Sequence, residues 1–218
     1  MNMDTFAGFI GGTGVNQIAS QTLASTTETE FKYNTGATPT TAIAILKVPL
    51  ATDIVGTRAP FDPALNPAST VRMGNRNLSQ YFNSNHIDNG VPFLVRICGL
   101  ATPASNAGNT LTIILYNGDD KGDTAIATTG AVPQATTTTA KAFIVEAELV
   151  WNSTSQTIVG QYWFQMAGSS GTTYTTWATL TAPGTSVTAA ALHFCASATW
   201  GDAVGGVVAV SEFSASRF

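Results

Sequence analysis

Few residues of this chain could carry out nucleophilic catalysis, because the only candidate bases are its two histidines, His86 and His193. His193 lies two residues before Cys195, so on a strand both side chains lie on one face, about 6–7 Å apart along it. A nucleophile and its base need hydrogen-bond contact, which neighbours along one strand seldom reach. We therefore expect a packed pair rather than a catalytic dyad. His86, in the polar stretch 83–89, is expected to face solvent or to hydrogen-bond at an interface.

Paired carboxylates occur twice, as Glu28 with Glu30 and as Glu146 with Glu148. Each pair lies on one face of a predicted strand. Glycoside hydrolysis would need a second carboxylate opposite, at about 5–9 Å, and the sequence identifies none. Solvated strand faces account for both pairs, and we expect no enzymatic activity.

Asp119, Asp120 and Asp123 lie in a glycine-flanked stretch, the kind of place where calcium is held. The stretch lacks the glycine and the terminal glutamate of an EF-hand loop. Two histidines and two cysteines are too few, and wrongly spaced, for a structural zinc motif. The sequence therefore predicts a hairpin turn here, with no metal and no cofactor.

Aromatic residues are the remaining candidates for a site. Tyr162, Trp163 and Phe164 are consecutive, so Trp163 faces opposite to its two neighbours on a strand. One of the two faces is core. The other places an aromatic ring at a surface, where it can stack on a sugar or bury against a subunit. Trp177 and Trp200, near predicted strand ends, could do the same, although core or subunit interface is the favoured interpretation for all three tryptophans.

Charge and cysteine usage exclude several classes of protein. Only 10% of the 218 residues are charged, the net charge is −4, and no basic cluster suits a nucleic-acid backbone. Cys98 and Cys195 lie in apolar runs and are predicted to be buried free thiols. The first residues do not resemble a secretory signal, and no apolar run is long enough to cross a bilayer. We expect a protein made and used in a reducing cytosol that binds neither membrane nor nucleic acid directly.

Strand signals recur through most of the chain, separated by Gly, Pro and Asn turns. Between Phe143 and Trp151 apolar residues alternate with polar ones, which indicates an antiparallel strand with one buried face. No amphipathic helix of twelve or more residues is visible. Many short strands predict an all-β antiparallel β-sandwich, jelly-roll-like, in one domain over 28–218. The predicted strands are 27–33, 41–48, 93–100, 110–117, 142–152, 158–167, 174–180, 190–199 and 206–216.

Two segments depart from this pattern. Residues 1–27 are rich in glycine and small polar residues and are predicted to form an N-terminal arm. Residues 57–92 are rich in Pro and Asn and are predicted to be a long contact loop, because long loops in compact domains usually have a function. Arginine and aromatic residues are typical interface anchors. The candidate interface residues in this loop are Arg58, Phe61, Arg72, Arg76, Tyr81 and Phe82.

The order of strands in the C-terminal two thirds resembles the jelly-roll structural proteins of tailed bacteriophages, in particular capsid cement or decoration proteins. The resemblance rests on the apolar strand 93–100, the run 111–118, the long strand 143–151, the strand 158–166 and the late strand at 192–194. It implies a non-enzymatic virion subunit, made in the host cytoplasm, that binds the major capsid protein and stabilises the head shell. The same resemblance implies a homotrimer on the capsid surface. No individual functional residue follows from the resemblance.

Two other functions remain open. A tail-fibre or receptor-binding sandwich would recognise host surface glycans, but such proteins usually carry collagen-like or coiled-coil repeats, which are not seen here. A secreted carbohydrate-binding module would carry a signal peptide. The sequence favours the capsid interpretation over both.

Overall fold

The computed structural model is almost entirely β-strand in the part of the chain that it describes. Within that part it has one turn of 3-10 helix, η4 (Ser169–Gly171), and no α-helix. This confirms the prediction of an all-β protein. The described residues are 21–23, 26–34, 39–49, 90, 92–104, 109–134, 138–152, 155, 157–181, 191–202 and 204–217.

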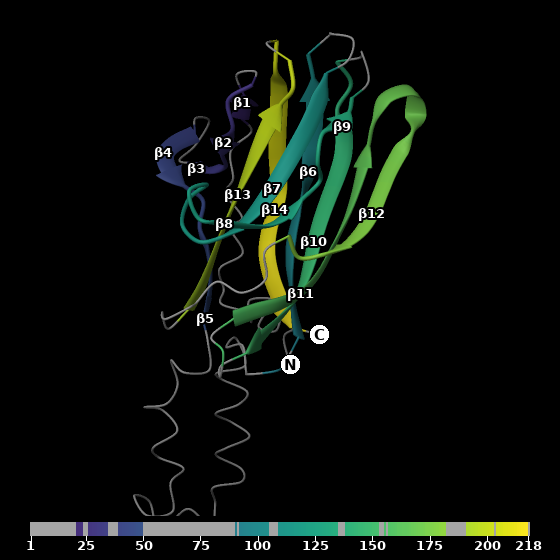
Figure 1. Cartoon of the computed structure of the whole chain (residues 1–218). Coiled ribbons are helices and arrows are strands. Elements are labelled where there is room, and N and C mark those ends of the chain that lie inside the picture. Colours follow the sequence, from purple (N-terminus) through teal and green to yellow (C-terminus); the bar gives the residue numbers. More distant parts are fainter. Residues whose placement is uncertain are drawn as a thin grey trace, which may run out of the picture.

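The larger of two main sheets has six strands, each antiparallel to its neighbours. The three strands β10, β11 and β12 follow one another as a meander, with β12 at the outer edge (Figure 1). In order across the sheet the strands are β1 (Gln21–Leu23), β14 (Gly206–Arg217), β6 (Pro92–Pro103), β10 (Lys141–Asn152), β11 (Thr157–Ala167) and β12 (Thr173–Thr179).

The smaller sheet is built around β13 (Ala191–Trp200) and β7 (Thr110–Asn117), which pair antiparallel. Short strands line both of its edges: β2 and β5 pair with β13, and β8 and β9 pair with β7. Their bounds are β2 (Thr29–Glu30), β5 (Leu46–Pro49), β8 (Thr124–Thr128) and β9 (Val132–Pro133). Two further strands, β3 (Lys32–Asn34) and β4 (Pro39–Ile43), pair only with each other.

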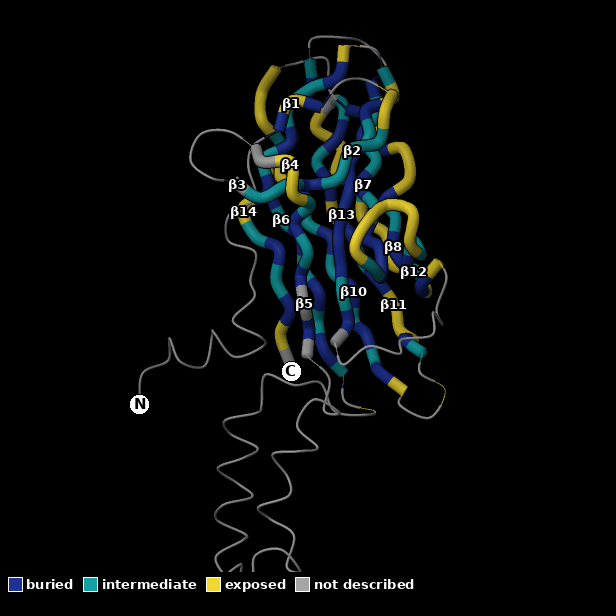
Figure 2. Tube along the Cα trace, turned by 90° about the vertical axis from the view of Figure 1, so that its left-hand side faces the viewer, coloured by how far each residue is buried: buried dark blue, intermediate teal, exposed yellow. Residues whose placement is uncertain are grey.

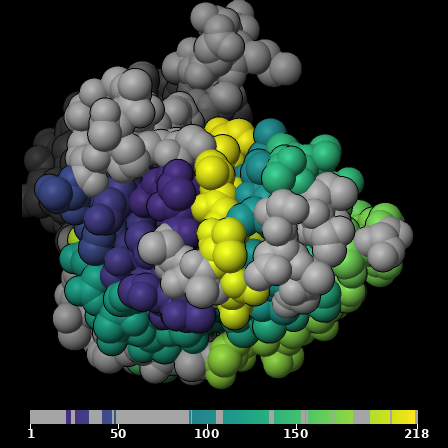
Figure 3. Space-filling view, turned by 90° about the horizontal axis from the view of Figure 1, so that it is seen from above, coloured from purple at the N-terminus to yellow at the C-terminus, as the bar shows by residue number. Residues whose placement is uncertain are grey.

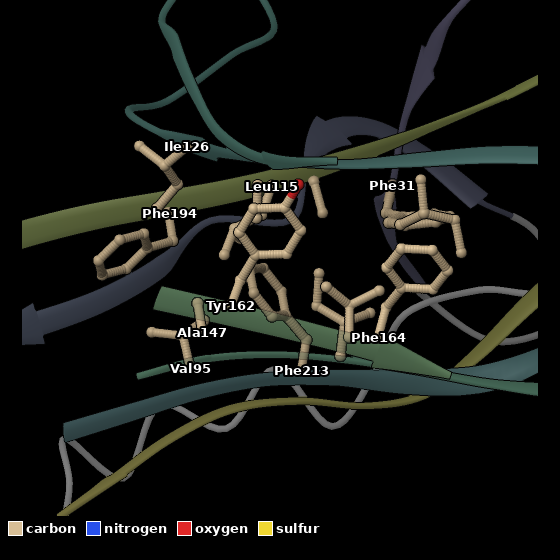
Figure 4. Packing of buried hydrophobic residues seen from close by; sticks show 14 of the residues in the cluster. Phe31, Val95, Leu115, Ile126, Ala147, Tyr162, Phe164, Phe194 and Phe213 are labelled. Atoms are coloured by element: carbon tan, nitrogen blue, oxygen red, sulfur yellow. The ribbon is translucent and has the colours of Figure 1, made fainter. Parts of the chain in front are cut away.

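A hydrophobic core fills the space between the two sheets. Val95, Ala147 and Phe213 of the larger sheet point toward Leu115 and Phe194 of the smaller one (Figure 4). Full burial of one such Leu or Phe side chain stabilises the fold by roughly 1.5–3 kcal/mol. Strands from both sheets contribute to this single cluster, so the described strands form a β-sandwich.

Alternation along the strands places one face of each sheet in this core. In β10 every second residue from Phe143 to Trp151 is buried, and the residues between them, including Glu146 and Glu148, are half-buried, as the sequence predicts. Figure 2 shows buried residues along the middle of β6, β10 and β13, with exposed residues at turns and along β12. The buried residues of β10 are Phe143, Val145, Ala147, Leu149 and Trp151.

The sequence predicts the long strands closely and the short ones poorly. The predicted strand 27–33 is interrupted at Phe31, which is fully buried and whose backbone bonds to Ala196 and Ala44. The predicted strand 41–48 is likewise divided into β4 and β5. Strands β8 and β9 were not predicted, because runs of five and two residues are too short to show a clear period. The jelly-roll topology itself stays a prediction.

The N-terminal segment contributes an edge to the sandwich. Strand β1 pairs with β14, and Leu23 is buried in the core. Figure 3 shows this segment (purple) packed against the C-terminal strand (yellow). Residues 21–23 of the predicted arm 1–27 are therefore part of the larger sheet, whereas 1–20 lie outside the described residues. Of the predicted loop 57–92, only residues 90 and 92 are described.

Candidate functional site

The six residues that the sequence identifies as interface candidates lie outside the described residues, as does His86. Their role in binding stays a prediction. The six are Arg58, Phe61, Arg72, Arg76, Tyr81 and Phe82. The remaining candidates divide among the outer faces of the two sheets, the 119–123 turn and, for Trp200, the core.

His193 and Cys195 share the outer face of the smaller sheet, but their chemistry is not that of a nucleophilic pair. The Nδ1 atom of His193 lies 2.6 Å from Oδ1 of Asp119. Cys195 is buried, and burial raises the pKa of its thiol to about 12, with Asp123 and Glu30 adding to the shift. Reactive cysteines have lowered pKa values, so this thiol is protonated and unreactive at neutral pH.

The aspartates of the 119–123 turn are bonded to their own backbone. Oδ2 of Asp123 accepts from the N–H groups of Asp119, at 2.7 Å, and Asp120, at 3.2 Å. Oδ1 of Asp120 accepts from the Gly122 N–H at 2.6 Å. These bonds build the predicted hairpin turn between β7 and β8. In the described part of the chain no group of three or more His, Cys, Asp and Glu side chains is placed to hold a metal ion.

Glu28 is not the solvated carboxylate that the sequence predicts, because its side chain is hydrogen-bonded to the smaller sheet. Its Oε1 accepts hydrogen bonds from the hydroxyls of Tyr116 and Ser197. Its backbone carbonyl accepts from Nζ of Lys121 at 2.7 Å. Burial raises the pKa of Tyr116 above its ordinary range, and the hydrogen bond to Glu28 raises it further. The sequence could not show this cluster, because its members come from distant segments.

The outer face of the larger sheet carries a row of side chains that crosses five strands. The pairing registers align Ser214 of β14 with Arg96 of β6, Arg96 with Glu146 of β10, Glu146 with Trp163 of β11, and Trp163 with Trp177 of β12. Directly opposed residues of antiparallel strands point to the same face. Arginine, carboxylate and two indoles therefore lie side by side on one rigid surface, which we call the tryptophan row.

Ion pairs and hydrogen bonds connect one end of the tryptophan row. Nε of Arg96 lies 3.2 Å from Oε1 of Glu146 and 4.0 Å from Oε2 of Glu212. Oε1 of Glu212 accepts from the Ser214 hydroxyl at 2.6 Å, and Oε2 lies 3.7 Å from Sγ of Cys98. These contacts hold the charged side chains against the sheet.

The two cysteines are free, as predicted, but Cys98 is not a core residue. In β6 the alternation places Ile97 inside and Cys98 on the outer face, where it is half-buried. Burial raises the pKa of the Cys98 thiol, and the nearby carboxylate of Glu212 raises it further. Cys98 and Cys195 lie on opposite outer faces of the sandwich, with the core between them, so they cannot form an intramolecular disulfide.

The tryptophans divide between surface and core. The rings of Trp163 and Trp177 have centroids 5.9 Å apart and planes inclined at 40°. Trp177 is 67% exposed and Trp163 is half-buried. Trp200, for which surface stacking was one possibility, is 0% exposed and belongs to the core, so that possibility is wrong. The alternation at Tyr162, Trp163 and Phe164 is as predicted, with Trp163 outward and its neighbours inward.

Comparisons with known proteins add no further identification. No protein-family model matches the chain, and neither the curated proteins nor the solved structures gave a match. The described part of the chain contains no helix that is long and apolar enough to cross a membrane. The functional argument therefore rests on the geometry of the outer faces.

Proposed function

We propose that the protein is a non-enzymatic structural subunit of a virus particle, of the cement or decoration type, which stabilises the head shell by binding the major capsid protein. The proposal rests on the burial and pairing of the side chains that could otherwise take part in nucleophilic catalysis. Cys195 is buried, and Nδ1 of His193 lies 2.6 Å from Oδ1 of Asp119. Such a body is suited to binding and load-bearing rather than to turnover.

Strand pairing in the sandwich supplies the rigid body that this function requires. Strands β6, β10 and β14 have 12 residues each and pair side by side in the middle of the larger sheet. β6 and β10 are paired along both edges, whereas β14 is paired along one edge with β6 and only at Gly206–Val208 with β1 on the other. The core covers one face of all three strands. A force applied at one end of the sandwich is therefore shared among many backbone hydrogen bonds.

Both segments proposed to contact the shell join this body at defined places. Residues 50–91 connect Pro49 of β5 to Pro92 of β6. In the registers, Pro49 lies opposite Ala191, and Phe93 lies opposite Arg217. These positions are the start of β13 and the end of β14, so the loop leaves and returns at one end of the sandwich. The arm precedes β1, at an edge of the larger sheet.

The proposed arm has a sequence suited to ordering on a partner. Residues 1–20 are rich in glycine and lack a regular apolar pattern. Ordering a backbone costs roughly 1–2 kcal/mol per residue, which contacts with the shell would have to offset. We expect the arm and the 57–92 loop to bind the capsid protein, with Arg58 and Tyr81 among the anchors.

A truncation that stops before β1 tests this proposal. Because Leu23 belongs to the core, deletion of residues 1–20 should leave the melting temperature nearly unchanged, whereas deletion of 1–25 should lower it. Binding is measured by co-sedimentation with empty head shells of the parent particle. The 1–20 deletion should sediment with shells more weakly than the full chain. Failure of the full chain to bind shells would contradict the proposal. Equal binding by the full chain and the 1–20 deletion would show that the arm does not contact the shell.

A further inference from the structure

We propose that the tryptophan row on the outer face of the larger sheet binds a neutral oligosaccharide, with Trp163 and Trp177 as the stacking platform. The proposal does not depend on binding to the head shell, which we assign to other segments of the chain. It rests on the exposure of the indole rings, on the polar groups beside them, and on the charge of the face.

The two indoles form a shallow platform open to solvent. Trp163 and Trp177 are directly opposed across β11 and β12, with ring centroids 5.9 Å apart. Trp177 is 67% exposed and Trp163 is half-buried, so both side chains have surface open to solvent. The face of an indole carries partial negative charge and attracts the weakly positive C–H groups on the flat side of a sugar ring. Two inclined rings can contact successive units of a sugar chain.

Hydrogen-bonding side chains border the platform on both sides. On the same face, the opposed pair Gln161 and Thr179 lies on one side of the two tryptophans. The opposed pair Gln165 and Thr175 lies on the other side. Amides and hydroxyls both donate and accept hydrogen bonds, which is what sugar hydroxyls require. An aromatic anchor for a protein is more often enclosed in a desolvated pocket within an apolar surround. This border therefore favours a saccharide.

Acidic side chains continue the border toward the centre of the sheet. Nε2 of Gln161 donates to Oε2 of Glu148 at 3.1 Å, so amide and carboxylate lie together beside the platform. Glu146, next to Trp163 in register, is held by Arg96. Exposed ion pairs of this kind contribute only about 0–1 kcal/mol to stability. The pair keeps the Glu146 carboxylate beside the platform, where it can accept from sugar hydroxyls.

The charge of the face selects against acidic sugars. Among the described side chains, the carboxylates of Glu146, Glu148 and Glu212 lie on it together with the guanidinium of Arg96. The chain as a whole also carries a net charge of −4. Like charges repel, so glycans rich in uronic acid, sialic acid or sulfate should bind poorly. The predicted ligand is therefore a neutral chain.

The platform is built before any ligand arrives. Its residues lie on paired strands, and the inward neighbours of Trp163, Tyr162 and Phe164, are locked in the core. Tryptophan has only two side-chain torsions to immobilise, so its ordering on binding costs little. Sites on rigid elements lose less entropy on binding than sites on loops.

Calorimetric titration of the full chain with soluble hexasaccharides tests the proposal. The neutral probes are cellohexaose, mannohexaose, maltohexaose and chitohexaose, and the acidic probe is an oligogalacturonate of similar length. At least one neutral probe should bind, with a change in tryptophan fluorescence. Trp177→Ala, at an exposed position, should weaken binding at least about tenfold. Gln161→Ala should weaken it about fivefold.

Leu100→Ala is the matched control, because Leu100 is exposed on the same face but lies outside the tryptophan row. It should bind like the parent chain, and all three variants should keep the parent far-ultraviolet spectrum. The proposal is wrong if no neutral probe binds, if Trp177→Ala binds unchanged, or if the oligogalacturonate binds as tightly. Loss of shell binding by Trp177→Ala, with no sugar bound, would identify a protein interface instead. Shell co-sedimentation of the same variants separates this result from a failure of the capsid proposal.

Discussion

At the scale of single residues, Glu28 attaches the N-terminal segment to the smaller sheet. Its carboxylate accepts from Tyr116 and Ser197, and its carbonyl accepts from Lys121. A carboxylate that accepts two hydroxyl donors makes charge-assisted hydrogen bonds, which are stronger than neutral ones. These contacts fasten the segment before β2 onto the outer face of β7 and β13.

Replacing Tyr116 by phenylalanine should reveal this attachment through its pH dependence. At pH 7, Tyr116→Phe should lower the free energy of unfolding by about 1.5–3 kcal/mol, for the loss of a hydrogen bond to a charged group. The folded state raises the pKa of Tyr116, so the stability from its protonated form is complete below about pH 10 and is lost as the pH rises through the folded value. The stability difference between parent and variant should therefore narrow above pH 10, as urea unfolding from pH 7 to 11 would measure. A constant difference would contradict this origin.

Thiol titration should distinguish the two cysteines. Both thiols have raised pKa values, and Cys195 is fully buried, so in the native protein it should react far more slowly with a disulfide reagent than half-buried Cys98. After unfolding without reductant, both should react. Cys98→Ser is the control: its native form should show almost no fast reaction, and its unfolded form one thiol. An unfolded parent chain with no reactive thiol would mean that a disulfide exists.

At the scale of elements, the β10–β11 pair depends on a glycine. Gly160 has φ +154° and lies opposite Leu149, and a Cβ placed on it would come within 2.0 Å of the Glu148 carbonyl oxygen. The backbone of β10 cannot move away without breaking its pairing with β6. The meander that presents Trp163 is thus sensitive to a single methyl group at this position.

Gly160→Ala should destabilise the protein by about 2–4 kcal/mol, from backbone strain and steric overlap together. Gly130→Ala is the matched control, because Gly130 also has a positive φ of +64° but has nothing within 4 Å of the added Cβ. It should cost only about 1–2 kcal/mol. Thermal or urea unfolding measures both. Equal losses in the two variants would show that steric overlap at Gly160 is relieved by relaxation.

At the scale of the whole molecule, we expect a homotrimer. Only 10% of residues are charged, and a surface with so little charge favours burial against neighbouring subunits. Light scattering coupled to size exclusion should give three times the mass of 22.6 kDa at micromolar concentration. A monomer both in solution and on isolated shells would contradict the expectation, whereas a monomer that trimerises on shells would support it.

The sequence by itself determined the class of the fold and the faces of its long strands. Between Phe143 and Trp151, local alternation shows which side chains share a face, because successive side chains of a strand point in opposite directions. The same logic placed Trp163 opposite to its neighbours. The short strands β8 and β9 were not predicted, since five and two residues are too few to show a clear period.

Only the tertiary structure decided which faces meet. Periodicity within one strand contains no information about the register of its partner, and a shift of one residue exchanges the two faces. Trp163 therefore came to lie beside Trp177, and Arg96 beside Glu146, through pairings that long-range packing selects. By local pattern, Trp200 was as much a surface candidate as Trp177. The same packing buried Trp200, because the face of β13 that carries it is turned toward the larger sheet.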